Sequence, residues 1–187
     1  MPRPNWFFGF PLDGSFVREL PELPANFRRF HPEDVHLTLA FLGSCGQTAA
    51  ERALSALDAR LQIEPMTPIA VSLGEVVAMG GSGRNYTALS ALLDAGRAEA
   101  TAAILSLRDP LTHAASGRIE NRAPKPHVSI ARPRARASEA DRRAGLSWAS
   151  QMRLQGVHAR LERIALYTWN EVRHERLFEI VEERRLT

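Results

Sequence analysis

Two short stretches of the 187-residue chain share a pattern of residue types that suits acid-base chemistry. Residues 36–39 read His-Leu-Thr-Leu and residues 127–130 read His-Val-Ser-Ile. Each begins with a histidine, followed two positions later by a hydroxyl residue, with branched aliphatic residues between and after them. Because the side chains of a strand alternate between its two faces, the histidine and the hydroxyl residue of each stretch are expected on the same face.

If these two faces meet, His36 and His127 share a pocket with the hydroxyl groups of Thr38 and Ser129. An imidazole has an ordinary pKa near 6.5, so near pH 7 one ring can accept a proton from water while the other donates one to a leaving oxygen. Hydroxyl groups can bind phosphate oxygens on which charge accumulates. Arg132, three residues after the serine, is a candidate for a forked contact with the same phosphate. The set predicts a phosphodiesterase with two catalytic histidines.

Other site chemistries lack the residues that they need. Zinc sites usually take three or four protein ligands, and no His-Glu-x-x-His or Cys-x-x-Cys motif is present. A serine hydrolase of the Gly-x-Ser-x-Gly type is excluded in the same way. We therefore expect no metal and no cofactor. Among the other histidines, His31 and His113 are candidate substrate contacts, whereas His158 and His174 lie among charged residues and are expected at the surface.

The composition is that of an ordinary globular protein. With 44% hydrophobic and 24% charged residues, the chain predicts one compact domain over residues 1–187, built as two lobes. The net charge is +3, and Lys125 is the only lysine among the 24 lysine and arginine residues. A general bias of composition explains most of the arginines, but individual ones near the pocket can bind phosphate.

The single cysteine and the hydropathy pattern bear on location. Cys45 lies in a Gly-Ser-Cys-Gly turn and has no second cysteine to pair with, which favours a reducing, cytoplasmic compartment. No apolar run approaches the roughly 18 residues of a membrane-spanning helix. We expect neither a membrane anchor nor secretion.

The elements expected to carry the site follow from periodicity and turn residues. Strands are predicted over residues 5–12, 35–42, 69–79, 86–93, 126–131, 157–168 and 176–182, with a turn at Gly80–Gly83. Helices are predicted over 15–20, 48–63 (capping box Thr48 and Glu51), 97–107 (closed by Pro110) and 138–151 (capping pair Ser138 and Asp141). This mixed order, rich in hairpins, indicates an α+β fold with mainly antiparallel sheets.

At the two histidine stretches the sequence resembles the two-histidine (2H) phosphoesterase superfamily, which carries two His-x-Thr/Ser-x motifs. Residues 36–43 (His-Leu-Thr-Leu-Ala-Phe-Leu-Gly) and 126–132 (Pro-His-Val-Ser-Ile-Ala-Arg) are similar to the motifs of RNA 2′,3′-cyclic phosphodiesterases, also called 2′-5′ RNA ligases. The resemblance covers nearly the whole chain. Two departures concern substrate preference more than chemistry: Ser129 replaces the commoner threonine, and Lys125 precedes the second motif.

The resemblance implies a bilobal α+β fold in which two mainly antiparallel sheets face a central cleft, with helices outside. It implies metal-independent hydrolysis of RNA 2′,3′-cyclic phosphate ends to a 2′-phosphate, and in reverse the formation of a 2′-5′ RNA link. It also implies that His127 is the base for water and His36 the acid for the leaving 3′-oxygen, although the residues themselves leave the roles open. We expect a monomer.

Substrate contacts are expected from arginines and aromatics around the cleft: Arg29, Phe41, Arg122 and Tyr167. Core packing is the competing interpretation for each ring, and alternation places Phe41 on the apolar face of its strand. Two further functions remain open. One is hydrolysis of a small cyclic phosphate, such as ADP-ribose 1″,2″-cyclic phosphate or a cyclic nucleotide. The other is a non-catalytic module that binds RNA ends, against which the two intact histidines argue.

Overall fold

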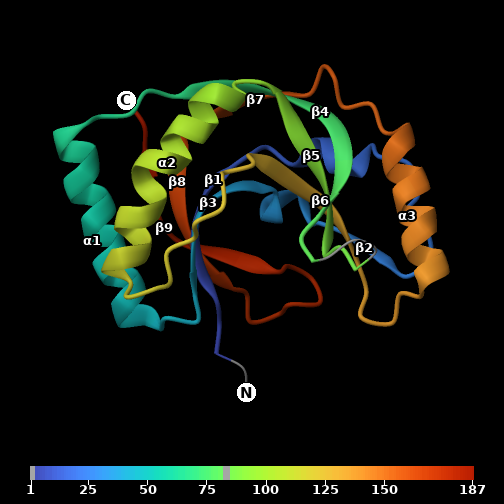
Figure 1. Ribbon diagram of the computed structural model, residues 1–187, viewed down its shortest axis with the longest axis horizontal. Helices are drawn as coiled ribbons and strands as arrows, with labels where there is room; N and C mark the ends of the chain where they lie inside the picture. Colours follow the sequence, from blue (N-terminus) through green and yellow to red (C-terminus); the bar gives the residue numbers. More distant parts are fainter. Residues whose placement is uncertain (1–2, 82–84) are drawn as a thin grey trace.

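The computed structural model describes residues 3–81 and 85–187 and confirms the α+β class (Figure 1). The strands within these residues are β1 (Trp6–Pro11), β2 (Phe27–Arg29), β3 (His36–Gly43), β4 (Ile69–Met79), β5 (Ala88–Ala95), β6 (His127–Pro133), β7 (His158–Leu161), β8 (Arg163–Trp169) and β9 (Phe178–Arg185). The α-helices are α1 (Gln47–Ile63), α2 (Arg97–Ala114) and α3 (Glu139–Gln151), and two 3₁₀-helices are η1 (Ser15–Arg18) and η2 (Pro32–Asp34).

All strand pairs are antiparallel and join into one curled sheet in the order β7-β4-β5-β6-β3-β1-β8-β9, with β2 beside β6. At the middle of this order, β3 and β6 pair through one register position, Leu37 with Val128. The sheet therefore has two halves that touch along a short seam, one with the strands β7, β4, β5, β6 and β2 and the other with β3, β1, β8 and β9. The two facing sheets expected from the sequence are these two halves, joined at the strands that carry the histidines.

The helices lie outside the sheet, as expected. In Figure 1, α1 and α2 pack together beside the half that contains β3, and α3 covers the half that contains β4 and β5. Helix α2 presents Ile104, Leu107 and Leu111 to the core, and each of them is at most 5% exposed. No helix within the described residues is long and apolar enough to cross a membrane.

Local predictions had mixed outcomes. The capping box of α3 is confirmed, because the Ser138 hydroxyl accepts from the Asp141 N–H and the Asp141 carboxylate accepts from the Ser138 N–H. The capping box predicted at Thr48 is wrong, since α1 begins after Gly46 with no side-chain cap. Helix α2 continues through Pro110 to Ala114, because burial of its apolar face outweighs one lost hydrogen bond. The predicted turn at 80–83 falls partly outside the described residues.

Candidate active site

The two histidine strands meet at the seam of the sheet. Leu37 and Val128, the paired residues, are both fully buried in the core. Because neighbours along a strand point to opposite faces, the residues that flank this pair share the other face: His36, Thr38, His127 and Ser129. Antiparallel pairing sets each histidine across from the hydroxyl residue of the other strand. The structure thus brings together the four residues that the sequence singled out.

Each histidine ring is oriented by a backbone carbonyl two residues before it. The Nδ1 of His36 lies 2.7 Å from the Asp34 carbonyl oxygen, and the Nδ1 of His127 lies 2.7 Å from that of Lys125. A carbonyl oxygen only accepts hydrogen bonds, so Nδ1–H must be the donor in both rings. In the neutral form of each ring, Nε2 is then the atom that can accept a proton.

Aromatic rings surround His36 and remove it from water. The ring centroids of Phe7, Tyr167 and Phe178 lie 4.8, 5.1 and 5.5 Å from that of His36. Burial lowers the pKa of His36 to about 4, while the hydrogen bond to the Asp34 carbonyl acts in the opposite direction and the charge of His127 lowers the pKa further. In the free protein the His36 ring is therefore neutral at pH 7.

This lowered pKa predicts that the protein loses stability in mild acid. The unfolded chain protonates His36 near its ordinary pKa of 6.5, whereas the folded chain protonates it only near 4, so the free energy of unfolding rises with pH across this window. Between pH 7 and pH 5 we expect His36 to account for a loss of about 2 kcal/mol. Urea unfolding of the wild type and of His36→Gln at both pH values measures it. Equal pH dependence in the two proteins would contradict the burial argument.

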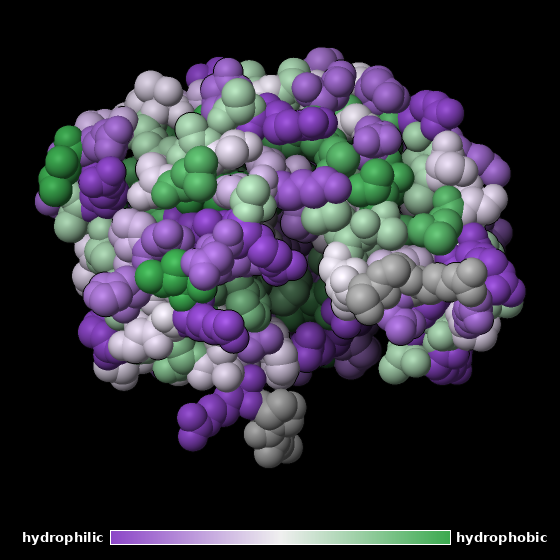
Figure 2. Space-filling model, viewed as in Figure 1, coloured by the Kyte–Doolittle hydropathy of each residue, from purple (hydrophilic) through white to green (hydrophobic). Residues whose placement is uncertain are grey.

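Two adjoining cavities lie on the face that carries the histidines. The first, of about 330 Å³, is lined by His36, Thr38 and Arg132 together with Asn5, Phe7, Phe41, Trp169, Arg173 and Phe178. The second, of about 470 Å³, is lined by residues that include His127, Ser129, Arg108, Arg122 and Lys125. Thr38 and Phe41 border both. Figure 2 shows this face of the molecule hollowed near its centre, with polar side chains around the opening.

Phe41 reaches the cavities because of an irregularity in β3. Phe8 of β1 pairs with Ala40, and the next residue, Gly9, pairs with Thr38, so Leu39 is an extra residue in the ladder. Such a bulge reverses the alternation beyond it. Phe41 therefore shares a face with Thr38 and is 55% exposed. The alternation argument that placed Phe41 on the apolar face is wrong for this reason.

The hydroxyl of Ser129 has a partner that the sequence did not indicate. Its Oγ lies 3.0 Å from the Oγ of Ser90, which faces it in the β5–β6 register and is fully buried. With Ser90 as the donor, the O–H of Ser129 is left to donate to a ligand. The buried hydroxyl thus fixes the position of the second motif's hydroxyl.

The family model described as 2′-5′ RNA ligase superfamily matches residues 17–173. The chain belongs to this superfamily. The match contains both histidine motifs and most of the sheet. Membership of the 2′-5′ RNA ligase superfamily, a group of 2H phosphoesterases, supports a phosphodiester-hydrolysing function, which makes the chain a hydrolase at this level of description.

Solved structures share the fold of this superfamily member. LigT of E. coli complexed with 3′-AMP has a TM-score of 0.71 and 18% identity, covering 100% of this chain and 99% of that chain. TT0787 of Thermus thermophilus has a TM-score of 0.64 and 19% identity, covering 97% of both chains. Usb1 of Kluyveromyces marxianus has a TM-score of 0.52 and 12% identity, covering 87% and 92%. No curated protein sequence matches the chain.

Of the other four residues predicted to contact the phosphate or the substrate, two line the cavities and two do not. Arg132 lines the first cavity. Arg29 does not reach either cavity, since its guanidinium donates to four backbone carbonyls of residues 17–21. Arg122 lines the second cavity and pairs with Glu120. Tyr167 is fully buried behind His36, where its ring stacks on Phe7, and burial raises its pKa; it supports the histidine and does not line a cavity.

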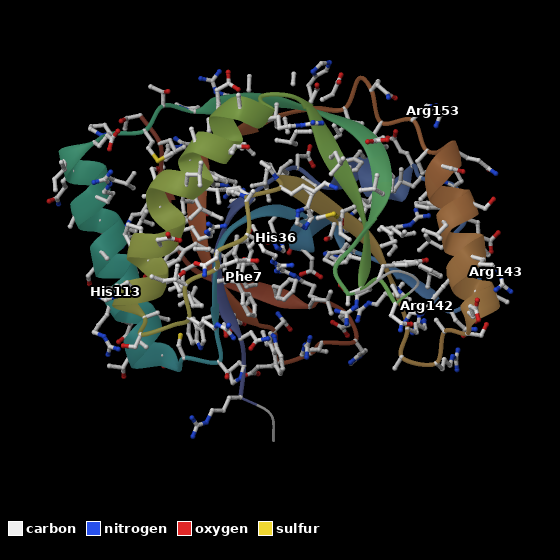
Figure 3. The ribbon with its side chains drawn as sticks, in the orientation of Figure 1. Phe7, His36, His113, Arg142, Arg143 and Arg153 are labelled. Atoms are coloured by element: carbon white, nitrogen blue, oxygen red, sulfur yellow. The ribbon has the colours of Figure 1, made fainter. Side chains whose placement is uncertain are left out.

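Several residues at the site carried no signal in the sequence. Asn5, Phe7, Trp169, Arg173 and Phe178 come from strand ends and from the loop between β8 and β9. The buried carboxylate of Asp34 accepts from the N–H groups of Leu177 and Phe178, and so fastens this loop to the segment that orients His36. The candidate contacts His31 and His113 line neither cavity; His113 lies near the end of α2 (Figure 3).

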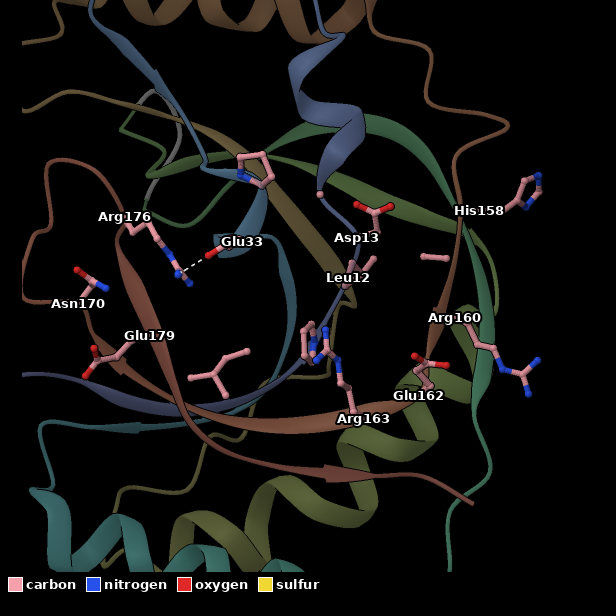
Figure 4. Close-up of a pocket in the computed structure, with 15 residues that line it drawn as sticks. Leu12, Asp13, Glu33, His158, Arg160, Glu162, Arg163, Asn170, Arg176 and Glu179 are labelled. Atoms are coloured by element: carbon pink, nitrogen blue, oxygen red, sulfur yellow. Dashed lines mark ion pairs between the residues drawn. The ribbon is translucent and has the colours of Figure 1, made fainter.

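A larger cavity of about 930 Å³ is lined by neither His36 nor His127. It is lined by charged side chains of both signs, among them Asp13, Glu33, Arg163 and Arg176. Figure 4 shows the ion pair between Arg176 and Glu33 that crosses part of it. Its size alone does not make it the active site, because the residues of the two histidine motifs line the smaller pair of cavities.

In the part of the chain that the structure describes, no group of three or more His, Cys, Asp or Glu side chains is placed to hold a metal ion. Metal independence stays a prediction, which activity in the presence of a chelator would test.

Proposed function

We propose that the single domain 1–187 hydrolyses RNA or nucleoside 2′,3′-cyclic phosphate ends to 2′-phosphates without a metal ion, and that it can form 2′-5′ RNA links in the reverse direction. The observation that carries this proposal is the pair of histidines on one face of the sheet seam, each oriented by a carbonyl and each set across from a hydroxyl group. The structure of LigT with 3′-AMP supports a nucleotide as the ligand class.

The geometry serves an in-line displacement at phosphorus. His36 borders the first cavity and His127 the second, with Thr38 between them. A phosphate bound beside Thr38 has one imidazole on each side, so that one can activate water while the other protonates the leaving oxygen. Thr38 and Ser129 donate to the non-bridging oxygens, where negative charge increases in the transition state.

The assignment of base and acid depends on when His36 is protonated. A ring that is neutral in the free protein is in the state of a general base. The roles implied by the family resemblance, with His36 as the acid, therefore require that the anionic phosphate raise the pKa of His36 toward its ordinary value on binding. Substrate binding in that case takes up a proton, which calorimetry in buffers of different ionisation enthalpy detects.

The direct test is incubation with an RNA that ends in a 2′,3′-cyclic phosphate, with EDTA present, and identification of the product. We expect a 2′-phosphate end at the same rate with and without the chelator. A 3′-phosphate product would contradict the proposed leaving group. Activity that disappears in EDTA and returns with a divalent ion would contradict the metal-free mechanism.

Phe41 is proposed to stack on a base of the substrate. Its ring is 55% exposed where the two cavities adjoin, and stacking of a base on an aromatic ring contributes about 1–3 kcal/mol. We expect Phe41→Ala to raise KM by about 10-fold with a smaller effect on kcat. Leu105 on α2 is equally exposed at 55% and lies outside both cavities, so Leu105→Ala is the matched control. An unchanged KM for Phe41→Ala would rule out stacking.

A further inference from the structure

Three arginines gather beside the first cavity without a carboxylate partner among the described residues. Arg28 of β2 and Arg132 of β6 face each other directly in the sheet register, an arrangement of like charges that destabilises a sheet. Burial first, and then the charges of Arg173 and Arg28, lower the pKa of Arg132. Such a cluster is stabilised when an anion binds to it.

The three side chains differ in how many donors are free. Arg28 donates to the carbonyls of Arg173, His174 and Glu175 at 2.8, 3.0 and 3.1 Å, so it fixes the loop between β8 and β9. The guanidinium of Arg173 lies 4.0 Å from the ring centroid of Trp169. Its buried Nε–H finds no acceptor within residues 3–81 and 85–187. Arg173 and Arg132 therefore hold donors for a ligand, and Arg28 holds Arg173 in place.

Arg132 and Arg173 share a cavity with the histidine and the hydroxyl residue of the first motif. Arg132 and Arg173 line the same space of about 330 Å³ as His36 and Thr38. This volume lies at the small end of ligand sites, so an anion at the arginines is separated from a phosphate at Thr38 by no more than a nucleoside-sized group. The anion is then part of the same molecule as the reacting phosphate.

We propose that Arg132 and Arg173 form a second phosphate subsite, which binds the phosphate on the 5′-oxygen of the terminal nucleoside. In an RNA this group is the phosphodiester to the preceding nucleotide, and in a small nucleotide it is a 5′-phosphate. The subsite rests on the proposed function, because that function places the cyclic phosphate between the histidines. It makes the protein prefer substrates that carry a second phosphate one ribose away from the first.

Binding of product-like ligands tests the subsite without turnover. We expect adenosine 2′,5′-bisphosphate to bind about 10-fold more tightly than adenosine 2′-phosphate in calorimetric titrations, as a charge-assisted contact allows. In Arg173→Gln the ratio of the two dissociation constants should fall to within about twofold. Arg143→Gln on α3 removes the same charge at a distant exposed position and should leave the wild-type ratio (Figure 3). A dinucleotide with a terminal 2′-phosphate carries a phosphodiester on the 5′-oxygen of its last nucleoside instead of a free 5′-phosphate. Only a subsite for RNA binds this phosphodiester, so the dinucleotide distinguishes RNA from a small nucleotide as the ligand.

Equal affinity of the wild type for the two adenosine ligands would overturn the subsite. A preference that survives Arg173→Gln, or one that Arg143→Gln removes equally, would also overturn it, because general attraction between charges would then explain the preference. Failure of the proposed function looks different. In that case adenosine 2′,3′-cyclic phosphate is not hydrolysed, whatever the ratio of the two dissociation constants.

Discussion

Replacing either His36 or His127 with alanine is expected to lower kcat on a 2′,3′-cyclic phosphate by about 10²–10⁴-fold, the usual contribution of a positioned acid or base. Both Nδ1 atoms donate to backbone carbonyls, which leaves Nε2 as the reactive atom of each ring. Alanine removes that atom without introducing another titratable group. Initial rates under saturating substrate measure the loss.

The two histidines should act as one unit. When a base and an acid work in the same step, the double variant loses little more activity than the worse single variant. His113→Ala, an exposed position that lines neither cavity, is the matched control and should retain the wild-type rate. A near-wild-type rate in either catalytic variant, with an unchanged circular dichroism spectrum, would show that this histidine takes no part in the chemistry.

The pH profile separates the two possible assignments. The dependence of kcat/KM on pH reports the free protein, in which burial lowers the pKa of His36 to about 4. If His36 is the base, kcat/KM rises with pH through this low pKa, and His36 does not limit the rate at higher pH. If His36 is the acid, kcat/KM falls as the pH rises above that low pKa. The two curves diverge most between pH 5 and pH 7.

The grouping of His36, Thr38, His127 and Ser129 on one face was predictable from the sequence because their arrangement is mostly local. Alternation along a strand sets a histidine and a hydroxyl residue on one face whatever the rest of the fold is. One long-range fact, the pairing of Leu37 with Val128, then brings the two faces together. The apolar residues of both motifs indicated buried strands, and the buried strands are adjacent at the centre of the sheet.

The walls of the site were less predictable because they depend on distant packing. The bulge at Leu39 moves Phe41 from the core to the cavity, and nothing in residues 36–43 marks it. From the sequence, Arg29 was a candidate substrate contact and Arg132 a candidate phosphate contact. The first donates to carbonyls near η1, whereas the second lines the cavity, and only the tertiary fold decides which arginine meets carbonyl groups.

The hydroxyl groups of the two motifs provide the second large expected effect. We expect Thr38→Val and Ser129→Ala each to lower kcat by about 10–10³-fold, comparable with the loss of one oxyanion donor, while KM changes less. Valine keeps the volume of threonine, so the loss measures the hydroxyl. Thr101 on α2, whose hydroxyl bonds to the Arg97 carbonyl on an accessible helix face, supplies the control Thr101→Val.

A Ser90→Ala variant shows why kcat falls in Ser129→Ala. If the hydrogen bond of 3.0 Å between them aims the Ser129 hydroxyl at the phosphate, Ser90→Ala should lower kcat by part of the loss seen in Ser129→Ala. Because Ser90 has no effect except through Ser129, the double variant should then equal Ser129→Ala alone. Additive losses would mean that Ser90 acts through the packing of β5 and β6. Unchanged kcat in both Thr38→Val and Ser129→Ala would remove the hydroxyl groups from the mechanism.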